Sequence, residues 1–214
     1  MNNIVILCNG AFPTEPYPLL LLDQADGVVC CDGAYLKFRA HFPDDRMPLA
    51  VVGDMDSLPE DEREKLGGIV IHESEQDYND LTKAMRWILR EHPEAEEIVI
   101  LGATGLREDH TVGNLGLLME FPRLLDLGTR KVSMVSDYST AFAITDTCDL
   151  HLGEGRRISL FSADNSLRIS STGLQWPTDG VVFDAWWKAT LNRTVAPVVQ
   201  LHFSHPSSAL IVVD

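Results

Sequence analysis

The segment VVGDMDS, residues 51–57, combines the two features that decide the fold of this chain: an apolar run ending in glycine, and acidic side chains directly after it. An apolar run of this kind is typical of a strand that is buried on both faces. If the chain stays extended after Gly53, the carboxylates of Asp54 and Asp56 point to the same side, about 6–7 Å apart. The pair then either caps the following turn or holds a cation.

Five further apolar runs are separated from this one, and from each other, by segments of helical character. Alternating strands and helices predict a doubly wound α/β domain with a mostly parallel, Rossmann-like sheet, which we expect to span residues 1–138. The clearest helix is at residues 79–92, because its apolar side chains recur at helical spacing, and we expect Asp80 to cap its start. The six predicted strands lie at residues 3–9, 27–31, 49–53, 68–72, 97–102 and 131–136.

The pattern changes after about residue 140. Short apolar runs are separated by turns that contain glycine, proline, asparagine or serine, and no helical pattern remains. We therefore expect residues 139–214 to form a small antiparallel β-sandwich domain. Its predicted strands lie at residues 156–162, 166–171, 180–187, 188–194, 197–204 and 209–214.

Acidic side chains follow several of the predicted parallel strands. In an open parallel sheet, ligands bind beyond the carboxyl ends of the strands, so we expect these acids to converge on one edge. Carboxylates bind Mg²⁺ in proteins, usually together with substrate phosphates. The stretch GATGLREDH, residues 102–110, precedes a predicted helix, and a helix start near glycines favours phosphate. The pattern predicts a metal-dependent site for phosphoryl chemistry. Its acids are Asp32, Asp54, Asp56, Asp77, Asp80 and Asp109.

The composition narrows the class of partner. The 214 residues include 32 acidic against 17 basic side chains, for a formal net charge of −15, which argues against duplex nucleic acid or an anionic membrane as partner. The N-terminal apolar stretch is too short for a signal peptide, and no run approaches the ~20 apolar residues of a membrane span. The four cysteines form no CxxC pair and are expected to be buried thiols. We expect a cytoplasmic protein that binds neither nucleic acid nor membrane.

Four motifs occur in the order and spacing of the thiamin pyrophosphokinases, and the chain resembles that family over nearly its whole length. The motifs are DGAY (32–35), GDMDS (53–57), DYNDLTKAM (77–85) and LGATGLREDHTVGNLGLL (101–118). The resemblance implies transfer of a pyrophosphoryl group from ATP to the hydroxyethyl group of thiamin, giving thiamin diphosphate and AMP, with Mg²⁺. It also implies a homodimer with active sites at the subunit interface. Residues 1–138 would then bind the nucleotide, and residues 139–214 would bind thiamin and form the dimer.

The resemblance also implies roles for individual residues. Asp54, Asp56 and Asp80 match the metal-binding carboxylates, and either Asp77 or Asp80 acts as the general base. The implied catalytic set is Asp54, Asp56, Asp77, Asp80, Arg107 and Asp109, in which Arg107 meets phosphate and Asp109 orients it. The implied nucleotide-binding set is Asp32, Gly33, Ser57, Thr104, Arg107, Asp109, His110 and Asn114. The implied thiamin-binding set is Gln76, Trp176 and Asn192.

Departures from the family pattern leave other functions open. Asn79 stands where the family usually has threonine, and Leu191 stands where it usually has a serine that would contact thiamin. The adjacent Trp186 and Trp187 have no assigned role. The same carboxylates also suit a Mg²⁺-dependent hydrolase or nucleotidyl-type enzyme acting on another phosphorylated substrate. A non-catalytic sensor of thiamin or nucleotide would share the fold.

Overall fold

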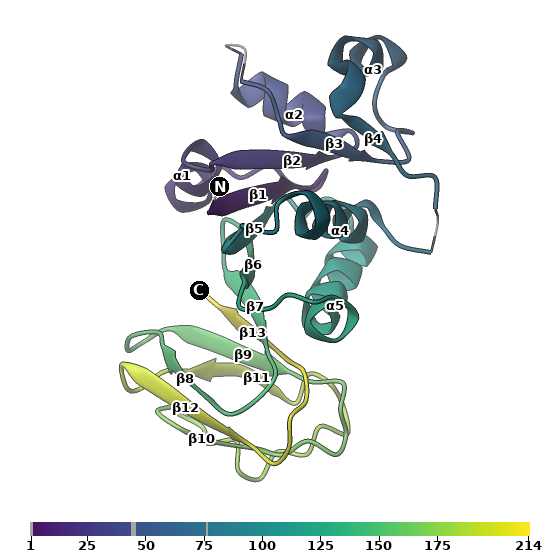
Figure 1. Ribbon diagram of the computed structural model, residues 1–214. Coiled ribbons are helices and arrows are strands. Elements are labelled where there is room, and N and C mark those ends of the chain that lie inside the picture. The colour runs from purple at the N-terminus through teal and green to yellow at the C-terminus, as the bar shows by residue number, and fades with distance from the viewer. Residues whose placement is uncertain (1, 44–45, 76) are drawn as a thin grey trace. The chain divides into compact units, whose positions relative to one another are not determined.

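The computed structural model of the chain contains two compact units (Figure 1). It describes residues 2–43, 46–75 and 77–214. The first unit contains the residues up to Asn114 together with Leu127–Asp137, and the second contains Leu115–Asp126 and Tyr138–Asp214. The second half of helix α5 (Glu108–Leu124) therefore groups with the C-terminal part of the chain, which the sequence did not indicate.

The first unit is built on six parallel strands, and each lies within one of the six predicted segments. Their order, β6-β5-β1-β2-β3-β4, places the first strand near the centre. Cys31 pairs with Val52, and Gly53 pairs with His72, so β2, β3 and β4 end at the same edge. The strands are β1 (Asn3–Leu7), β2 (Gly27–Cys31), β3 (Ala50–Gly53), β4 (Val70–His72), β5 (Glu97–Leu101) and β6 (Lys131–Val135).

Helices cover both faces of this sheet. Side chains alternate between the faces of a strand, and on one face Val5, Cys30 and Val51 pack with side chains of the first three helices. On the other face, α4 contacts β1, β2 and β3. The prediction of a doubly wound, mostly parallel fold is confirmed. The helices are α1 (Pro16–Asp23), α2 (Ala34–His41), α3 (Glu60–Leu66), which a short 3₁₀ turn (Gly67–Ile69) follows, and α4 (Asp80–Glu91).

Helix α4 has a different cap from the one predicted. Asn79 Oδ1 accepts a hydrogen bond from the backbone N–H of Thr82 at 3.1 Å, so Asn79 is the N-cap. Asp80 is the first helical residue, and the prediction that it caps the helix is wrong. Because Asn79 satisfies the helix start, the carboxylate of Asp80 is available for contacts with the strand ends.

The second unit is an antiparallel β-sandwich, as predicted. One sheet has the order β11-β9-β13-β7 and the other has the order β10-β12-β8. Side chains from both sheets, among them Leu160, Leu201 and Ile211, share one core. No helix occurs in the part of the chain that is described after Asp137. The strands are β7 (Thr140–Ile144), β8 (Cys148–His151), β9 (Arg157–Phe161), β10 (Ile169–Thr172), β11 (Ala189–Arg193), β12 (Val198–Phe203) and β13 (Ala209–Val213).

Three details of the second unit differ from the sequence prediction. The segment 180–187, predicted as a strand, is an irregular loop in which Trp186 and Trp187 are half-exposed. The ring of Trp186 packs beside that of Phe161, with 5.2 Å between the ring centroids. Strands β7 and β8 were not predicted, because β7 contains alanines, which disfavour strands, and β8 alternates polar and apolar residues.

The cysteines are free thiols, as expected, and Cys8, Cys30 and Cys31 are buried. Burial raises the pKa of the Cys30 thiol, which packs in the core. Cys148 is only partly buried. Within the described ranges, no helix is both long enough and apolar enough to cross a membrane.

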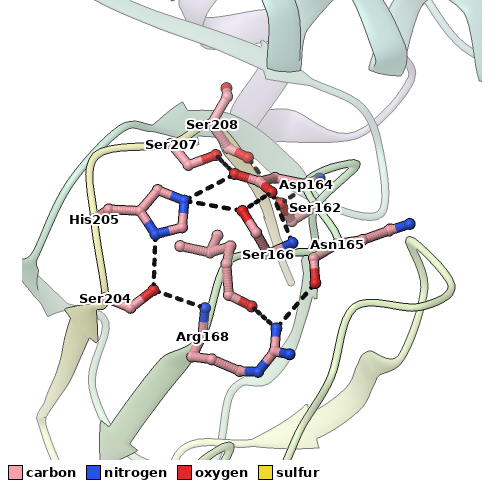
Figure 2. A network of polar contacts seen from close by, with 10 residues as sticks. Ser162, Asp164, Asn165, Ser166, Arg168, Ser204, His205, Ser207 and Ser208 are labelled. Carbon is pink, nitrogen blue, oxygen red and sulfur yellow. Dashed lines mark hydrogen bonds and ion pairs between the residues drawn. The ribbon is translucent and has the colours of Figure 1, made fainter.

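A polar network joins two loops of the second unit, one before β10 and one before β13 (Figure 2). Asp164 lies at its centre. Its Oδ1 accepts hydrogen bonds from the hydroxyl and the backbone N–H of Ser166, at 2.6 and 2.8 Å. Its Oδ2 accepts from the hydroxyl of Ser207 at 2.8 Å and lies 3.0 Å from Nε2 of His205. The Ser166 hydroxyl, with these other donors, holds the pKa of the Asp164 carboxyl well below its usual range.

We expect Asp164→Asn to lower the free energy of unfolding by about 1–2 kcal/mol at pH 7, because an amide cannot accept all of these hydrogen bonds. The folded-state pKa of Asp164 is depressed, so its carboxylate stabilises the protein above the unfolded-state pKa of about 3.9. That stabilisation is lost as the pH falls toward the folded-state pKa. In urea unfolding, the difference between the two proteins should therefore shrink from pH 7 to pH 3. The exposed Asp179, changed to asparagine, is the matched control, and a difference that is independent of pH contradicts the prediction.

Candidate active site

A cavity of about 320 Å³ lies at the carboxyl ends of the strands in the first unit. Residues that follow β1, β2, β3 and β5 line it, together with the starts of α4 and α5. A Cβ at Gly102 would lie 2.5 Å from the backbone oxygen of Cys8, so only glycine lets these two loops approach. The lining residues with polar side chains include Asn9, Asp32, Ser57, Asn79, Asp80, Arg107, His110 and Asn114.

Three carboxylates meet beside this cavity. Asp32 follows β2, Asp54 follows β3 and Asp80 begins α4, and one oxygen of each lies within 4.8 Å of the others. Gly53 makes this approach possible, because a Cβ there would lie 3.0 Å from Cβ of Asp32 and 3.1 Å from Cγ of Asp80. A larger residue at position 53 would push the acids apart. Oxygen ligands from three separate elements suit a hard divalent cation such as Mg²⁺.

Asp32 supplies an independent indication of a cation. The residue is only 5% exposed, and its Oδ2 accepts a hydrogen bond from the backbone N–H of Ser57 at 2.8 Å. Its Oδ1 is buried and has no hydrogen-bond partner in the described chain. A buried carboxylate oxygen without a donor is costly, and a bound cation would remove that cost. The residues present therefore fit a divalent ion.

The Asp-Met-Asp turn differs from the extended geometry that the sequence suggested. Met55 has a left-handed backbone (φ 67°) and a buried side chain, so the regular alternation of a strand stops there. Asp56 is exposed and lies outside the three-carboxylate group. Its backbone N–H donates to Asp54 Oδ1 at 3.2 Å. The extended backbone assumed for the pair is wrong at Met55, and Asp56 as a metal ligand stays a prediction.

Asp80 is the member of the acid cluster that contacts a buried lysine. The ammonium group of Lys83, one helical turn further along α4, is 3.4 Å from Asp80 Oδ1. Burial raises the pKa of the Asp80 carboxyl, and the charges of Asp54 and Asp32 raise it further, whereas Lys83 opposes the rise. Asp80 therefore holds its proton more tightly than an ordinary aspartate, and the lysine limits that effect.

The predicted phosphate-binding segment lies at the start of α5. Arg107 lines the cavity and forms an exposed ion pair with Asp109, with 2.5 Å between Nη2 and Oδ2. Asn114 is buried, and its amide donates to the backbone oxygen of Ala103 at 2.7 Å. Asn79 donates to Asn114 Oδ1 at 2.9 Å, which links the cap of α4 to α5. Asn114 thus orients the loop after β5, a role that the motif alone did not reveal.

Four other residues predicted for this site are not among the described residues that line the cavity. Gly33 is a close-packing position, where a Cβ would lie 2.8 Å from the Asn9 side chain. Neither Asp77 nor Thr104 is among the described residues that line the cavity. Asp77 is exposed, and Thr104 is half-buried. Gln76 lies outside the described residues. The prediction missed Cys8, Asn9 and Gly10, although their place directly after β1 was a signal of the same kind as for Asp32.

Trp176 and Asn192 lie together in the second unit, beside a cavity of about 400 Å³. The indole of Trp176 is exposed, whereas Asn192 is buried. Asn192 donates to the backbone oxygen of Trp176 at 2.6 Å and accepts from its backbone N–H at 3.2 Å. The neighbouring Leu191 is 84% exposed in a left-handed conformation (φ 60°). The Asn192 amide therefore fixes the backbone that presents the tryptophan ring.

Comparisons with known proteins cover both units. The family model described as thiamin pyrophosphokinase, catalytic domain, matches residues 19–127, and the model described as thiamin pyrophosphokinase, substrate-binding domain, matches residues 140–210. Thiamine pyrophosphokinase 1 of Oryza sativa subsp. japonica is 31% identical over 201 residues, which is 82% of this chain and 73% of that protein.

Solved structures show the same fold. The thiamine pyrophosphokinase from Bacillus subtilis aligns with a TM-score of 0.77 at 19% identity, over 100% of this chain and 99% of that one. The yeast thiamin pyrophosphokinase aligns with a TM-score of 0.77 at 16% identity, over 99% of this chain and 86% of that one. The two domain models match most of the residues in the order predicted from the motifs, and the Oryza sativa relative is similar over four fifths of the chain. The chain therefore belongs to the thiamin pyrophosphokinase family.

Proposed function

We propose that this protein transfers a pyrophosphoryl group from ATP to the hydroxyethyl oxygen of thiamin, with Mg²⁺, and releases AMP. The observation that carries the proposal is the cluster of Asp32, Asp54 and Asp80 at the cavity, with its unpartnered buried oxygen, in a chain of this family. The thiamin oxygen attacks the β-phosphorus, the bond from that phosphorus to the oxygen bridging to the α-phosphorus breaks, and AMP leaves with that oxygen.

Asp32, Asp54 and Asp80 would hold the Mg²⁺, and Asp56 is a further predicted ligand from the solvent side. A bound Mg²⁺ neutralises the charge that polyphosphate brings to a protein of net charge −15. Adding Asp32 to the ligands changes the role predicted for it, from nucleotide contact to metal contact. The proposed Mg²⁺ site therefore rests on carboxylate oxygens that come from three elements, and not on the GDMDS motif (53–57) alone.

The chain's own groups position the remaining parts of the reaction. Arg107 lines the cavity and is placed to meet phosphate oxygens, and the N-terminal end of α5, which also lines the cavity, favours an anion. Asp109, paired with Arg107, orients its guanidinium. Asp77 and Asp80 both stay predicted as the general base: Asp80 lines the cavity, whereas Asp77 is exposed.

Thiamin is a cation, and aromatic faces attract cations. Trp176 presents an exposed indole from the second unit and is the proposed stacking partner of thiamin, held in place by Asn192. Gln76 stays a predicted contact on the opposite face of the thiamin rings. Assembly as a homodimer, with the C-terminal domain of one chain contributing to thiamin binding in the other, is part of the same proposal, and so is the predicted cytoplasmic location.

A product assay tests the reaction. Purified protein is incubated with thiamin, ATP and Mg²⁺, and we expect thiamin diphosphate and AMP in equal amounts, with no product when EDTA replaces Mg²⁺. Formation of ADP and thiamin monophosphate would contradict pyrophosphoryl transfer. Release of phosphate from ATP without use of thiamin would favour a hydrolase. Binding of thiamin without any product would favour a sensor.

A further inference from the structure

Lys83 is a buried charge that the proposed reaction does not use. Its side chain is 2% exposed and is among the largest fully buried side chains of the described chain. Burying an ammonium group is costly unless a charged partner compensates it. The ion pair that the structure shows for Lys83 is with Asp80, at 3.4 Å. Asp80 is therefore the residue through which Lys83 can affect the acid cluster.

Lys83 contacts the acid cluster through Asp80. Asp80 is among the described residues that line the cavity, and Lys83 is not. The three carboxylates together carry a charge of −3 when ionised, and the ammonium brings the local charge to −2. That charge matches a single divalent cation. The ammonium group of Lys83 also reduces the repulsion among the three carboxylates, which Gly53 allows to lie close together.

We propose that Lys83, through its ion pair with Asp80, acts as an internal counter-charge, which limits the site to moderate binding of one divalent cation. The inference rests on the proposed cation site. Removing the ammonium leaves a more negative cluster, so the protein without substrates should bind a divalent cation more tightly. The same change leaves Asp80 without its fixed partner, so turnover should fall. A purely structural lysine would instead weaken cation binding and turnover together.

The test measures Mn²⁺ binding to the full chain without substrates, by titration calorimetry at pH 8, where protons compete little with the cation. The variants are Lys83→Met, which keeps the length of the side chain, and Lys83→Gln, which keeps a donor for Asp80 but removes the charge. Lys65→Met is the matched control, because the ion pairs that the structure shows for Lys65 are with Asp61 and Glu62 on α3 and not with an acid of the cluster. Asp54→Asn shows whether the measured site is the acid cluster.

We expect one Mn²⁺ per unsubstituted chain, at least fivefold tighter binding in both Lys83 variants, and no change in Lys65→Met. The kcat for thiamin diphosphate should fall about fivefold in Lys83→Met and less in Lys83→Gln, with the KM for thiamin unchanged. Equal or weaker Mn²⁺ binding in folded Lys83 variants overturns the inference while leaving the cation site intact. Failure of both variants to fold, even with Mn²⁺, also overturns it. Absence of binding by the unsubstituted protein, or binding that survives in Asp54→Asn, overturns the cation site itself.

Discussion

Asp54→Asn should reduce the rate of thiamin diphosphate formation by about 10²- to 10³-fold at saturating ATP and thiamin, which corresponds to roughly 3–4 kcal/mol in the activation barrier. The asparagine keeps the size of the side chain but removes one of the three carboxylates that would hold Mg²⁺. The fold should be intact, because losing one of three neighbouring like charges relieves repulsion. Initial rates over a range of Mg²⁺ concentrations, with a thermal melt of the same sample, measure both effects.

Two companion variants make this result specific. Asp61→Asn changes the charge equally on exposed α3, where Asp61 pairs with Lys65, and it should leave the rate within twofold of the unsubstituted protein. Asp56→Asn should reduce the rate less than Asp54→Asn, because Asp56 is exposed and lies outside the three-carboxylate group. If Asp56→Asn reduces the rate as much, Asp56 is a full ligand and the structural assignment is incomplete. If Asp54→Asn retains full activity, the metal site is wrong.

The fold of the first unit was largely predictable from the sequence. Its central strands β1, β2, β3 and β5 are largely buried on both faces, so they read as continuous apolar runs, and helix α4 has a strongly one-sided apolar pattern. In the second unit the same rule failed at residues 180–187, where valine and tryptophan side chains lie in a loop. Apolar residues there do not pair with a neighbouring strand, and sequence alone does not show which runs find a partner.

The site was predictable as a set of strand ends but not as a geometry. Acids after β2 and β3 were expected at one edge, and the structure places Asp32 and Asp54 there together with Asp80. The departure from expectation comes from Met55, whose left-handed backbone interrupts the extended chain between Asp54 and Asp56. A methionine gives no local signal for that conformation, which is more usual for glycine or asparagine. The role of Asn192 was hidden for a similar reason, because its partner is the backbone of a residue 16 positions away.

Trp176→Ala should raise the KM for thiamin by about 5- to 30-fold, with a smaller change in the KM for ATP. A cation stacked on an indole is stabilised by roughly 1–2 kcal/mol, which corresponds to that range. Trp176 is 56% exposed, so the loss of its ring should cost little stability. Steady-state kinetics with each substrate varied in turn measure the effect, and urea unfolding checks the fold.

Trp187→Ala is the matched control, because Trp187 is 53% exposed in the same unit and is not among the described residues that line the cavity of about 400 Å³ beside Trp176. It should leave both KM values unchanged. Asn192→Ala should reproduce part of the thiamin effect, since the amide holds the Trp176 backbone through two hydrogen bonds, and it should also lower stability, since Asn192 is buried. A Trp176→Ala protein that unfolds would place the tryptophan in the core. A Trp176→Ala protein that folds and binds thiamin normally would show that thiamin does not stack on this indole.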